Sequence, residues 1–252
     1  MLHAFLLIGQ SNAAGRGNIE NAPRLNNRHG RMKLFRNGRW QAMFRPINPD
    51  RGSSGISFAE SFCKCFADAY PEEEIGIIPC ADGGTSLSQW MPGELLYDYA
   101  LACARLGMRT AHLTGILWHQ GESDCAPEDA ATYCERLQLM MTQLRKDLGN
   151  PQLPILVGGL GEFLTGCERF PEVKNYQAVN AQLIKFADED ACCAFVDADR
   201  LEGKADCLHF TAQAQEEFGK RYFAAWQTLN ISLPGGSENI QDTSSRSEME
   251  QL

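Results

Sequence analysis

The apolar positions of this chain alternate between short continuous runs and longer runs at helical spacing. Residues 4–8 are apolar throughout and end at Gly9, as in a strand buried on both faces. Within residues 57–70 the aromatic side chains recur at helical spacing until Pro71. Such patterns predict five buried strands, at 4–8, 75–79, 113–118, 155–157 and 194–197, and helices at 57–70, 94–108, 127–148, 171–188 and 211–229.

Strands alternate with helices along the chain, which is the pattern of a parallel sheet covered by helices on both faces. We therefore expect an α/β fold, a flavodoxin-like three-layer α/β/α sandwich with a five-stranded parallel sheet. Asn37-Gly38 separates two further short segments and predicts a β-hairpin. We expect one domain over residues 1–230 and a disordered polar tail over residues 231–252, which have little to bury.

In the predicted helix at 94–108, the apolar side chains gather on one face. They are Leu95, Leu96, Tyr99, Ala102 and Leu106. The helix at 127–148 opens with Pro127-Glu128-Asp129, which is favourable in a first helical turn, and closes at Gly149.

Composition and charge narrow the class of protein. The 252 residues are 44% hydrophobic and 22% charged, which excludes collagen-like and wholly disordered chains. A formal net charge of −9 argues against a nucleic-acid partner, and no apolar run is long enough to span a membrane. Ten cysteines without a C-x-x-C motif indicate reduced thiols rather than a zinc site.

The first residues lack a basic segment ahead of a short apolar run, unlike a secretory signal peptide. Together with the cysteines, this favours a cytoplasmic location. The alternative is a secreted protein from which the signal has been removed.

Polar, glycine-rich segments follow each of the five predicted strands, where ligands bind in open α/β sheets. Ser11 follows the first strand directly, and its hydroxyl needs a base to act as a nucleophile. His209 stands three residues after Asp206, a spacing at which the carboxylate can hold the imidazole. Together these residues predict a Ser11–Asp206–His209 triad, although each residue alone fits a helix cap equally well.

An oxyanion hole needs hydrogen-bond donors aimed at the charge that develops during acyl transfer. The candidates are the Ser11 backbone N–H, a backbone N–H of Gly83 or Gly84, and the side-chain amide of Gln120. Gln120 could instead be a buried hydrogen-bonding residue. The P-loop, the G-x-G-x-x-G fingerprint and the G-x-S-x-G elbow are absent, which disfavours nucleotide binding and a lipase-type α/β-hydrolase.

Four motifs in this order resemble the signature blocks of the SGNH (GDSL-like) hydrolases. Within them the similarity is to the sialate O-acetylesterase and acetylxylan esterase group, carbohydrate esterase family six. The motifs are Gly9-Gln10-Ser11-Asn12, Asp82-Gly83-Gly84-Thr85-Ser86, Trp118-His119-Gln120-Gly121-Glu122-Ser123-Asp124 and Asp206-x-x-His209-Phe210, which span residues 9–210.

This resemblance implies the SGNH hydrolase fold and a serine esterase that removes acetyl groups from sugars without a cofactor or a metal. It makes Ser11 the nucleophile, His209 the base and Asp206 the residue that orients the base. Gly83 and Gln120 match the oxyanion positions, with Gly84 as the alternative to Gly83. Cys207 departs from the pattern, because the family usually has glycine there, and a positive φ would strain it.

Further residues of these motifs, and two near them, are candidate substrate contacts. Arg16 could bind a substrate carboxylate or be a solvated loop charge, and Trp90 could stack on a sugar or pack in the core. Glu122 could fix Gln120 or His119, or act as an additional acid. The full set of candidate contacts is Gln10, Asn12, Arg16, Gly84, Trp90, His119 and Glu122.

The resulting hypothesis is a carboxylic ester hydrolase that releases acetate from carbohydrates, of sialate or xylan type, through an acyl-enzyme intermediate. Its partner would be a small O-acetylated sugar, with no nucleic acid and no membrane. Two alternatives stay open: a non-catalytic carbohydrate-binding module on the same fold, and a thioesterase or other acyl hydrolase that uses the same triad.

Overall fold

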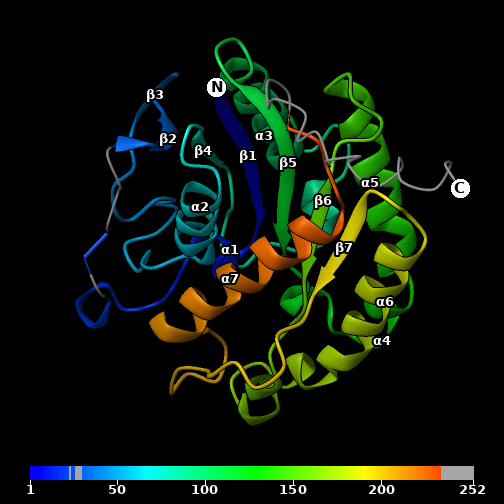
Figure 1. Ribbon diagram of the computed structural model, residues 1–252. Helices are drawn as coiled ribbons and strands as arrows, with labels where there is room; N and C mark the ends of the chain where they lie inside the picture. Colours follow the sequence, from blue (N-terminus) through cyan, green and yellow to red (C-terminus); the bar gives the residue numbers. More distant parts are fainter. Residues whose placement is uncertain (23, 26–29, 234–252) are drawn as a thin grey trace, which may run out of the picture.

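A seven-stranded sheet forms the centre of the molecule (Figure 1). The computed structural model of the chain describes residues 1–22, 24–25 and 30–233. The strands are β1 (Leu2–Gly9), β2 (Met32–Arg36), β3 (Arg39–Ala42), β4 (Glu74–Pro79), β5 (His112–His119), β6 (Ile155–Gly158) and β7 (Cys193–Val196). They lie in the order β3-β2-β4-β1-β5-β6-β7, and every pair is parallel except β2–β3.

The predicted α/β architecture is confirmed, because β4-β1-β5-β6-β7 is the flavodoxin-like strand order. The predicted number of five strands is too low, since the hairpin at Asn37-Gly38 joins the same sheet. Its first strand pairs with β4 in parallel, with Met32 opposite Ile75. Asn37 and Gly38 have φ values of 53° and 73°, as a two-residue hairpin turn with the twist of the strands requires.

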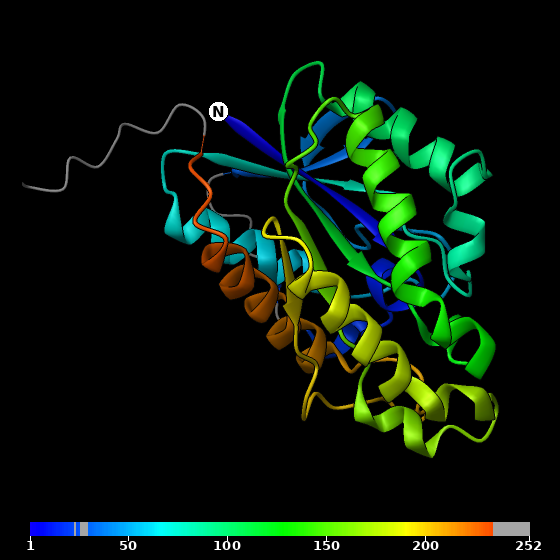
Figure 2. The same ribbon diagram turned by 90° about the vertical axis from the view of Figure 1, so that its right-hand side faces the viewer.

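Helices cover both faces of the sheet (Figures 1 and 2). One layer contains α2 (Phe58–Ala69) and α7 (Ala212–Thr228), and the other contains α3 (Leu95–Gly107), α5 (Tyr133–Asp147) and α6 (Tyr176–Asp188). The connections contain α1 (Ser11–Ala14), α4 (Pro127–Ala131) and the 3₁₀ helices η1 (Ile19–Asn21), η3 (Leu87–Trp90), η4 (Glu122–Asp124), η5 (Glu162–Gly166) and η6 (Pro171–Asn175).

Strand β1 has a continuous apolar run because it is buried on both of its faces. Successive side chains of a strand point to opposite faces. Leu6 and Ile8 therefore enter the core on the side of α3, α5 and α6, whereas Phe5 and Leu7 enter the core on the side of α2 and α7. All four side chains are fully buried or nearly so.

Polar caps set the start of the two helices that share one layer. The Ser57 hydroxyl accepts a hydrogen bond from the Ala59 N–H at the start of α2, and Thr211 does the same for Ala214 at the start of α7. Helix α2 ends at Ala69, just before Tyr70 and Pro71, because proline disfavours a helical residue ahead of it.

Three helical predictions need correction. The predicted helix at 127–148 is two helices, because Thr132 leaves the helical region with φ −107° and ψ 5°. The predicted helix at 171–188 begins with a 3₁₀ turn, Pro171–Asn175, before α6. The apolar face predicted for α3 points mainly to solvent, with Leu95, Tyr99 and Leu106 exposed.

The predicted tail begins with ordered packing. Ile231 and Leu233 pack against the core beside α2 and α7, and residues 234–252 lie outside the described residues. Within the described part of the chain, no helix is both long enough and apolar enough to cross a membrane.

Candidate active site

The end of β1 places the predicted nucleophile. Gly9 closes the strand with φ 125°, and a Cβ there would lie 2.1 Å from the His119 carbonyl oxygen, so only glycine fits. Helix α1 then begins at Ser11, whose backbone N–H is at a helix N-terminus and has no hydrogen-bond partner among the described residues. A free donor therefore lies directly beside the Ser11 hydroxyl.

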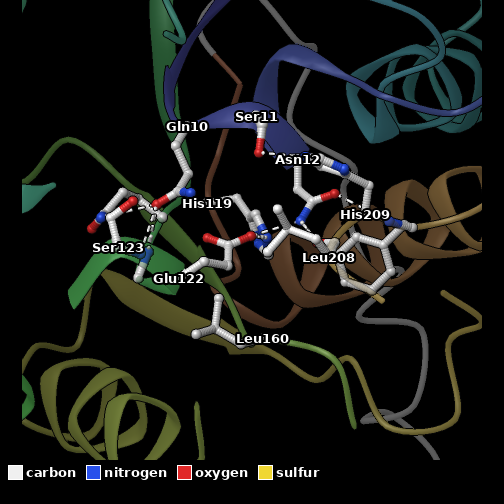
Figure 3. Close-up of polar contacts among 12 residues, drawn as sticks. Gln10, Ser11, Asn12, His119, Glu122, Ser123, Leu160, Leu208 and His209 are labelled. Atoms are coloured by element: carbon white, nitrogen blue, oxygen red, sulfur yellow. Dashed lines mark hydrogen bonds and ion pairs between the residues drawn. The ribbon is translucent and has the colours of Figure 1, made fainter. Parts of the chain in front are cut away.

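The structure brings the three predicted triad residues together. His209 Nε2 lies 3.1 Å from Ser11 Oγ, and His209 Nδ1 lies 2.9 Å from Asp206 Oδ2. Figure 3 shows His209 reaching the Ser11 hydroxyl from the turn that precedes α7. These are hydrogen-bond distances, so the imidazole can take the hydroxyl proton while the carboxylate holds the ring.

The Asp206 carboxylate is built into its own turn. Its Oδ1 accepts hydrogen bonds from the backbone N–H groups of Leu208 and His209, both at 3.0 Å. Burial acts to raise the pKa of Asp206, but the hydrogen bonds from the His209 ring and from these N–H groups outweigh it and lower that pKa. Asp206 thus caps the turn with one oxygen and orients His209 with the other.

Cys207 occupies the left-handed region in this turn, with φ 51°. The strain expected for a non-glycine residue at this position is therefore present. The turn keeps its shape all the same, because the Asp206 side chain binds the two backbone N–H groups that follow Cys207.

Asn12 links the nucleophile to the base. Its Nδ2 donates to the Leu208 carbonyl at 3.2 Å, and its Oδ1 accepts from the Phe210 N–H at 3.1 Å. Asn12 therefore binds the residues on both sides of His209. Asn12 was predicted to contact the substrate. It is 1% exposed and instead forms part of the buried scaffold of the site.

A buried carboxylate fixes this amide. Glu122 Oε1 accepts from Asn12 Nδ2 at 2.6 Å and lies 3.4 Å from His119 Nε2 (Figure 3). Burial acts to raise the pKa of Glu122, but the interactions with His119 and Asn12 outweigh it and lower that pKa. A charged, buried Glu122 is suited to positioning, which favours the predicted link to His119 over a role as an additional acid.

Arg16 fits neither predicted alternative, a contact to a substrate carboxylate or a solvated loop charge, because it is buried and bound to Asp50. It is 6% exposed, and its guanidinium binds Asp50 at 3.0 and 2.7 Å. Asp50 also accepts from the Gly83 N–H at 2.9 Å. Although burial acts to raise the pKa of Asp50, the hydrogen bonds from Arg16 and Ser54 contribute to lowering it. The pair therefore pins the Gly83 loop to the nucleophile turn.

Two of the predicted oxyanion donors are already engaged. The Gly83 N–H donates to Asp50, and Gln120, which is fully buried, donates from Nε2 to the Thr85 carbonyl and to Asp124 at 3.1 and 2.6 Å. Gly84 is exposed, and its N–H has no hydrogen-bond partner among the described residues. Among the backbone N–H groups predicted for the oxyanion hole, those of Ser11 and Gly84 are therefore the ones without an acceptor in the described part of the chain.

The remaining candidate contacts are also buried. Trp90 is 1% exposed, donates to Thr85 Oγ1 at 3.0 Å and packs edge-on against Trp118, so the packing alternative holds for it. His119 and Gln10 are 0% and 3% exposed. Of the seven predicted substrate contacts, Gly84 alone is exposed.

Two residues of the scaffold carried no signal in the sequence. Asp50 lies in a connection without a motif, and Gln215 lies within α7. Gln215 donates to the Asn12 carbonyl at 3.1 Å and accepts from the Phe58 N–H at 2.8 Å, so it ties α7 and α2 to the nucleophile turn. Among the described residues, no group of three or more His, Cys, Asp or Glu side chains is placed to hold a metal ion.

Comparison with known proteins identifies the family. Residues 1–228 match the family model described as carbohydrate esterase, sialic acid-specific acetylesterase. The chain belongs to this family. The predicted resemblance is thereby confirmed, and the protein is a carboxylic ester hydrolase.

The relatives support this assignment across nearly the whole chain. A probable carbohydrate esterase of Arabidopsis thaliana is 28% identical over 235 residues, covering 85% of this chain and 86% of its own. Its X-ray structure superimposes with a TM-score of 0.79 at 25% identity, over 90% of this chain and 98% of that one. The fold is shared with NanS (TM-score 0.66, 17% identity, 90% and 97% coverage) and with a carbohydrate acetylesterase of Xanthomonas citri (0.68, 19%, 90% and 56%).

Proposed function

We propose that this carbohydrate esterase is a serine enzyme that hydrolyses O-acetyl esters of small sugars. The observation that carries the proposal is the unbroken sequence of hydrogen-bond distances from Ser11 Oγ through His209 to Asp206. The family description and the acetylesterase relative support an acetylated sugar as the substrate. Sialate-type and xylan-type acetyl esters are the first to test.

In the first half of the reaction, Ser11 Oγ attacks the acetyl carbonyl carbon while His209 Nε2 takes the hydroxyl proton. The tetrahedral oxyanion accepts hydrogen bonds from the N–H groups of Ser11 and Gly84, which have no competing acceptor among the described residues. The bond to the sugar oxygen then breaks, and that oxygen leaves with the proton from His209.

In the second half, His209 takes a proton from water, and the water oxygen attacks the acetyl-Ser11 carbonyl. Collapse of this second intermediate releases acetate and returns the proton to Ser11 Oγ. Asp206 stays ionised throughout and stabilises the imidazolium that forms in each half, in keeping with its lowered pKa. Gln120 supports the oxyanion loop through Thr85 and Asp124.

The test is acetate release from a panel of O-acetylated sialic acids, acetylated xylo-oligosaccharides, an aryl acetate and an acetyl thioester. Ser11→Ala should lower kcat/KM by roughly 10⁴–10⁶-fold with the fold intact. Ser88→Ala, at an exposed serine of η3, is the matched control and should retain activity.

Near-wild-type hydrolysis by Ser11→Ala would refute the serine mechanism. Binding of acetylated sugars without acetate release would support the binding-module alternative. Preference for the thioester would support a thioesterase.

A further inference from the structure

Helix α3 carries a second apolar face that nothing in the described chain covers. Leu95, Tyr99 and Leu106 are 81%, 53% and 47% exposed, and Ala102 between them is exposed as well. The opposite side of the helix holds the side chains that pack into the core, namely Tyr97, Ala100, Leu101 and Ala104. The exposed four, here called the α3 stripe, therefore point directly away from the sheet.

The α3 stripe stands out from the rest of the surface. The other exposed large apolar side chains are mostly single residues on separate elements, such as Ile19, Phe44 and Ile184. Isolated apolar side chains are normal on a surface, whereas a contiguous row marks an interaction site. Beside the stripe runs an open groove between α3 and α5 with a volume of about 840 Å³, lined by Asp98, Arg105 and Leu139 among others.

The spacing of the stripe indicates what covers it. Its members are separated by four, three and four residues, which is the seam spacing of two helices packed side by side. An antiparallel pair, related by a two-fold axis between Ala100 and Leu101, sets Leu95 against Leu106 of the partner subunit. Tyr99 then meets Ala102 of the partner subunit. The stripe is thus complementary to itself, as an isologous interface requires.

The charges beside the seam support the same arrangement. Asp98 and Arg105 lie on one flank of the stripe, seven residues apart. Arg105 Nη2 donates to the Asp147 carbonyl at 2.8 Å, whereas Asp98 makes no ion pair within the described residues. In the antiparallel pair, Asp98 lies beside Arg105 of the partner subunit, and Arg105 lies beside Asp98 of the partner subunit. A parallel pair would bring equal residues to the same level and would set no opposite charge of the partner subunit beside Asp98.

We propose that the α3 stripe is the interface of a two-fold symmetric homodimer in which the α3 helices of two copies of this chain pack antiparallel. Seam contacts between the leucines, Tyr99 and Ala102 hold the dimer, and two Asp98–Arg105 ion pairs fix its direction. Both active sites are complete without the partner, since every triad residue comes from one chain.

The first experiment measures molar mass by sedimentation or light scattering. The wild-type chain, of 28.0 kDa, should have twice that mass at micromolar concentration. Leu95→Glu and Leu106→Glu should each shift it to the monomer, with the circular dichroism spectrum and aryl acetate hydrolysis unchanged. Ile184→Glu, at an exposed apolar residue of α6, is the matched control and should remain a dimer.

The second experiment tests direction by charge reversal. Asp98→Arg alone and Arg105→Asp alone should each weaken dimerisation at least about tenfold, since both create like-charge pairs. An equimolar mixture of the two variants should restore a dimer, because each mixed dimer contains both opposite-charge pairs.

Three outcomes would overturn the proposal. A wild-type chain that stays monomeric to about 100 μM would show that a second copy of this chain does not cover the stripe. A dimer that survives both leucine substitutions would place the interface on another surface. Failure of the mixed variants to associate would exclude the antiparallel arrangement. None of these outcomes depends on the chemistry proposed for Ser11.

Discussion

The Glu122 carboxylate receives a 2.6 Å hydrogen bond from the Asn12 amide, although the two residues are 110 positions apart in the sequence. This bond turns the Asn12 nitrogen toward Glu122 and Leu208 and its oxygen toward the Phe210 N–H. Glu122 therefore acts on His209 through Asn12, without touching the reacting atoms. The nucleophile and the base are held at 3.1 Å by a network whose two central side chains, Asn12 and Glu122, are both buried.

Asn12→Ala removes this link and should lower kcat roughly 10–100-fold while KM changes little, because the loss is in the placement of His209. Asn12→Asp should be at least as damaging, since it sets a second carboxylate against Glu122. The measurement is kcat and KM with an aryl acetate.

Asn180→Ala provides the control for that experiment. Asn180 likewise binds backbone, accepting from the Leu160 N–H and donating to the Leu160 carbonyl, but it holds a loop that carries no triad residue. Equal losses of kcat in the two alanine variants would show that Asn12 has no special part in positioning the base.

Substitution of the two neighbouring glycines should have different effects. A Cβ at Gly83 would lie 2.4 Å from Arg16 Nη2 and 2.9 Å from Asp50 Oδ2, so Gly83→Ala must displace a buried ion pair. We expect a loss of about 3 kcal/mol in the free energy of unfolding, together with a large loss of activity.

Gly84→Ala meets nothing within 4 Å, but Gly84 has φ +79°. It should cost about 1 kcal/mol and retain most of the activity, since the backbone N–H remains. Urea unfolding and aryl acetate kinetics measured on both variants check this order, and the reverse order would contradict the loop geometry.

Cys207→Gly should stabilise the protein. Glycine adopts the positive φ of this position without a steric penalty, and the gain is about 0.5–1 kcal/mol after the entropy of the unfolded chain is subtracted. Cys207→Ala keeps the Cβ and should bring no gain. Urea unfolding of the three proteins decides the point, and a less stable glycine variant would show that the Cys207 side chain contributes more than its strain costs.

Glu60 should give the protein a pH-dependent stability. Burial raises the pKa of this carboxyl from 4.5 to about 7, although Arg45 at 2.7 Å opposes the shift. Between these values the folded chain holds a proton that the unfolded chain has lost, so the free energy of unfolding falls as pH rises from about 4.5 to about 7. The fall attributable to Glu60 has an upper limit of about 3 kcal/mol.

Glu60→Gln should remove this part of the pH dependence, which urea unfolding at pH 5 and pH 7.5 measures. Glu217→Gln, at an exposed carboxylate of α7, is the control and should leave the slope as in the wild type. A wild-type slope in Glu60→Gln would mean that another group is responsible.

Much of the fold could be predicted because the strands are buried on both faces and the helices between them are amphipathic. The hairpin at Asn37-Gly38 was predictable from its turn, but its attachment to β4 was not, since strand pairing is a contact between distant segments. For helix α3, the extent was predictable but the buried face was predicted wrongly. The helix has apolar residues on two faces, and periodicity alone does not say which face meets the core.

The site shows a similar division. Ser11, Asp206 and His209 could be predicted because each has a chemistry of its own and follows a strand or precedes a helix. The partners of Arg16 and Trp90 could not, because Asp50 and Thr85 meet them only in the folded chain. Motif residues such as Asn12 and Glu122 proved to be parts of the buried scaffold, and the surface that selects the sugar has no comparable signal in the sequence.

The base and its carboxylate are three residues apart, whereas the nucleophile and the base are separated by 198 residues. The Asp206–His209 pair can thus form locally, and one long-range closure remains for assembly of the triad. That closure is the docking of α7, in which Gln215 forms hydrogen bonds with the backbone of Asn12 and Phe58. On the proposed mechanism, refolding chains would recover their helical circular dichroism before they recover hydrolysis. The rate at which aryl acetate turnover returns would then report the docking of α7.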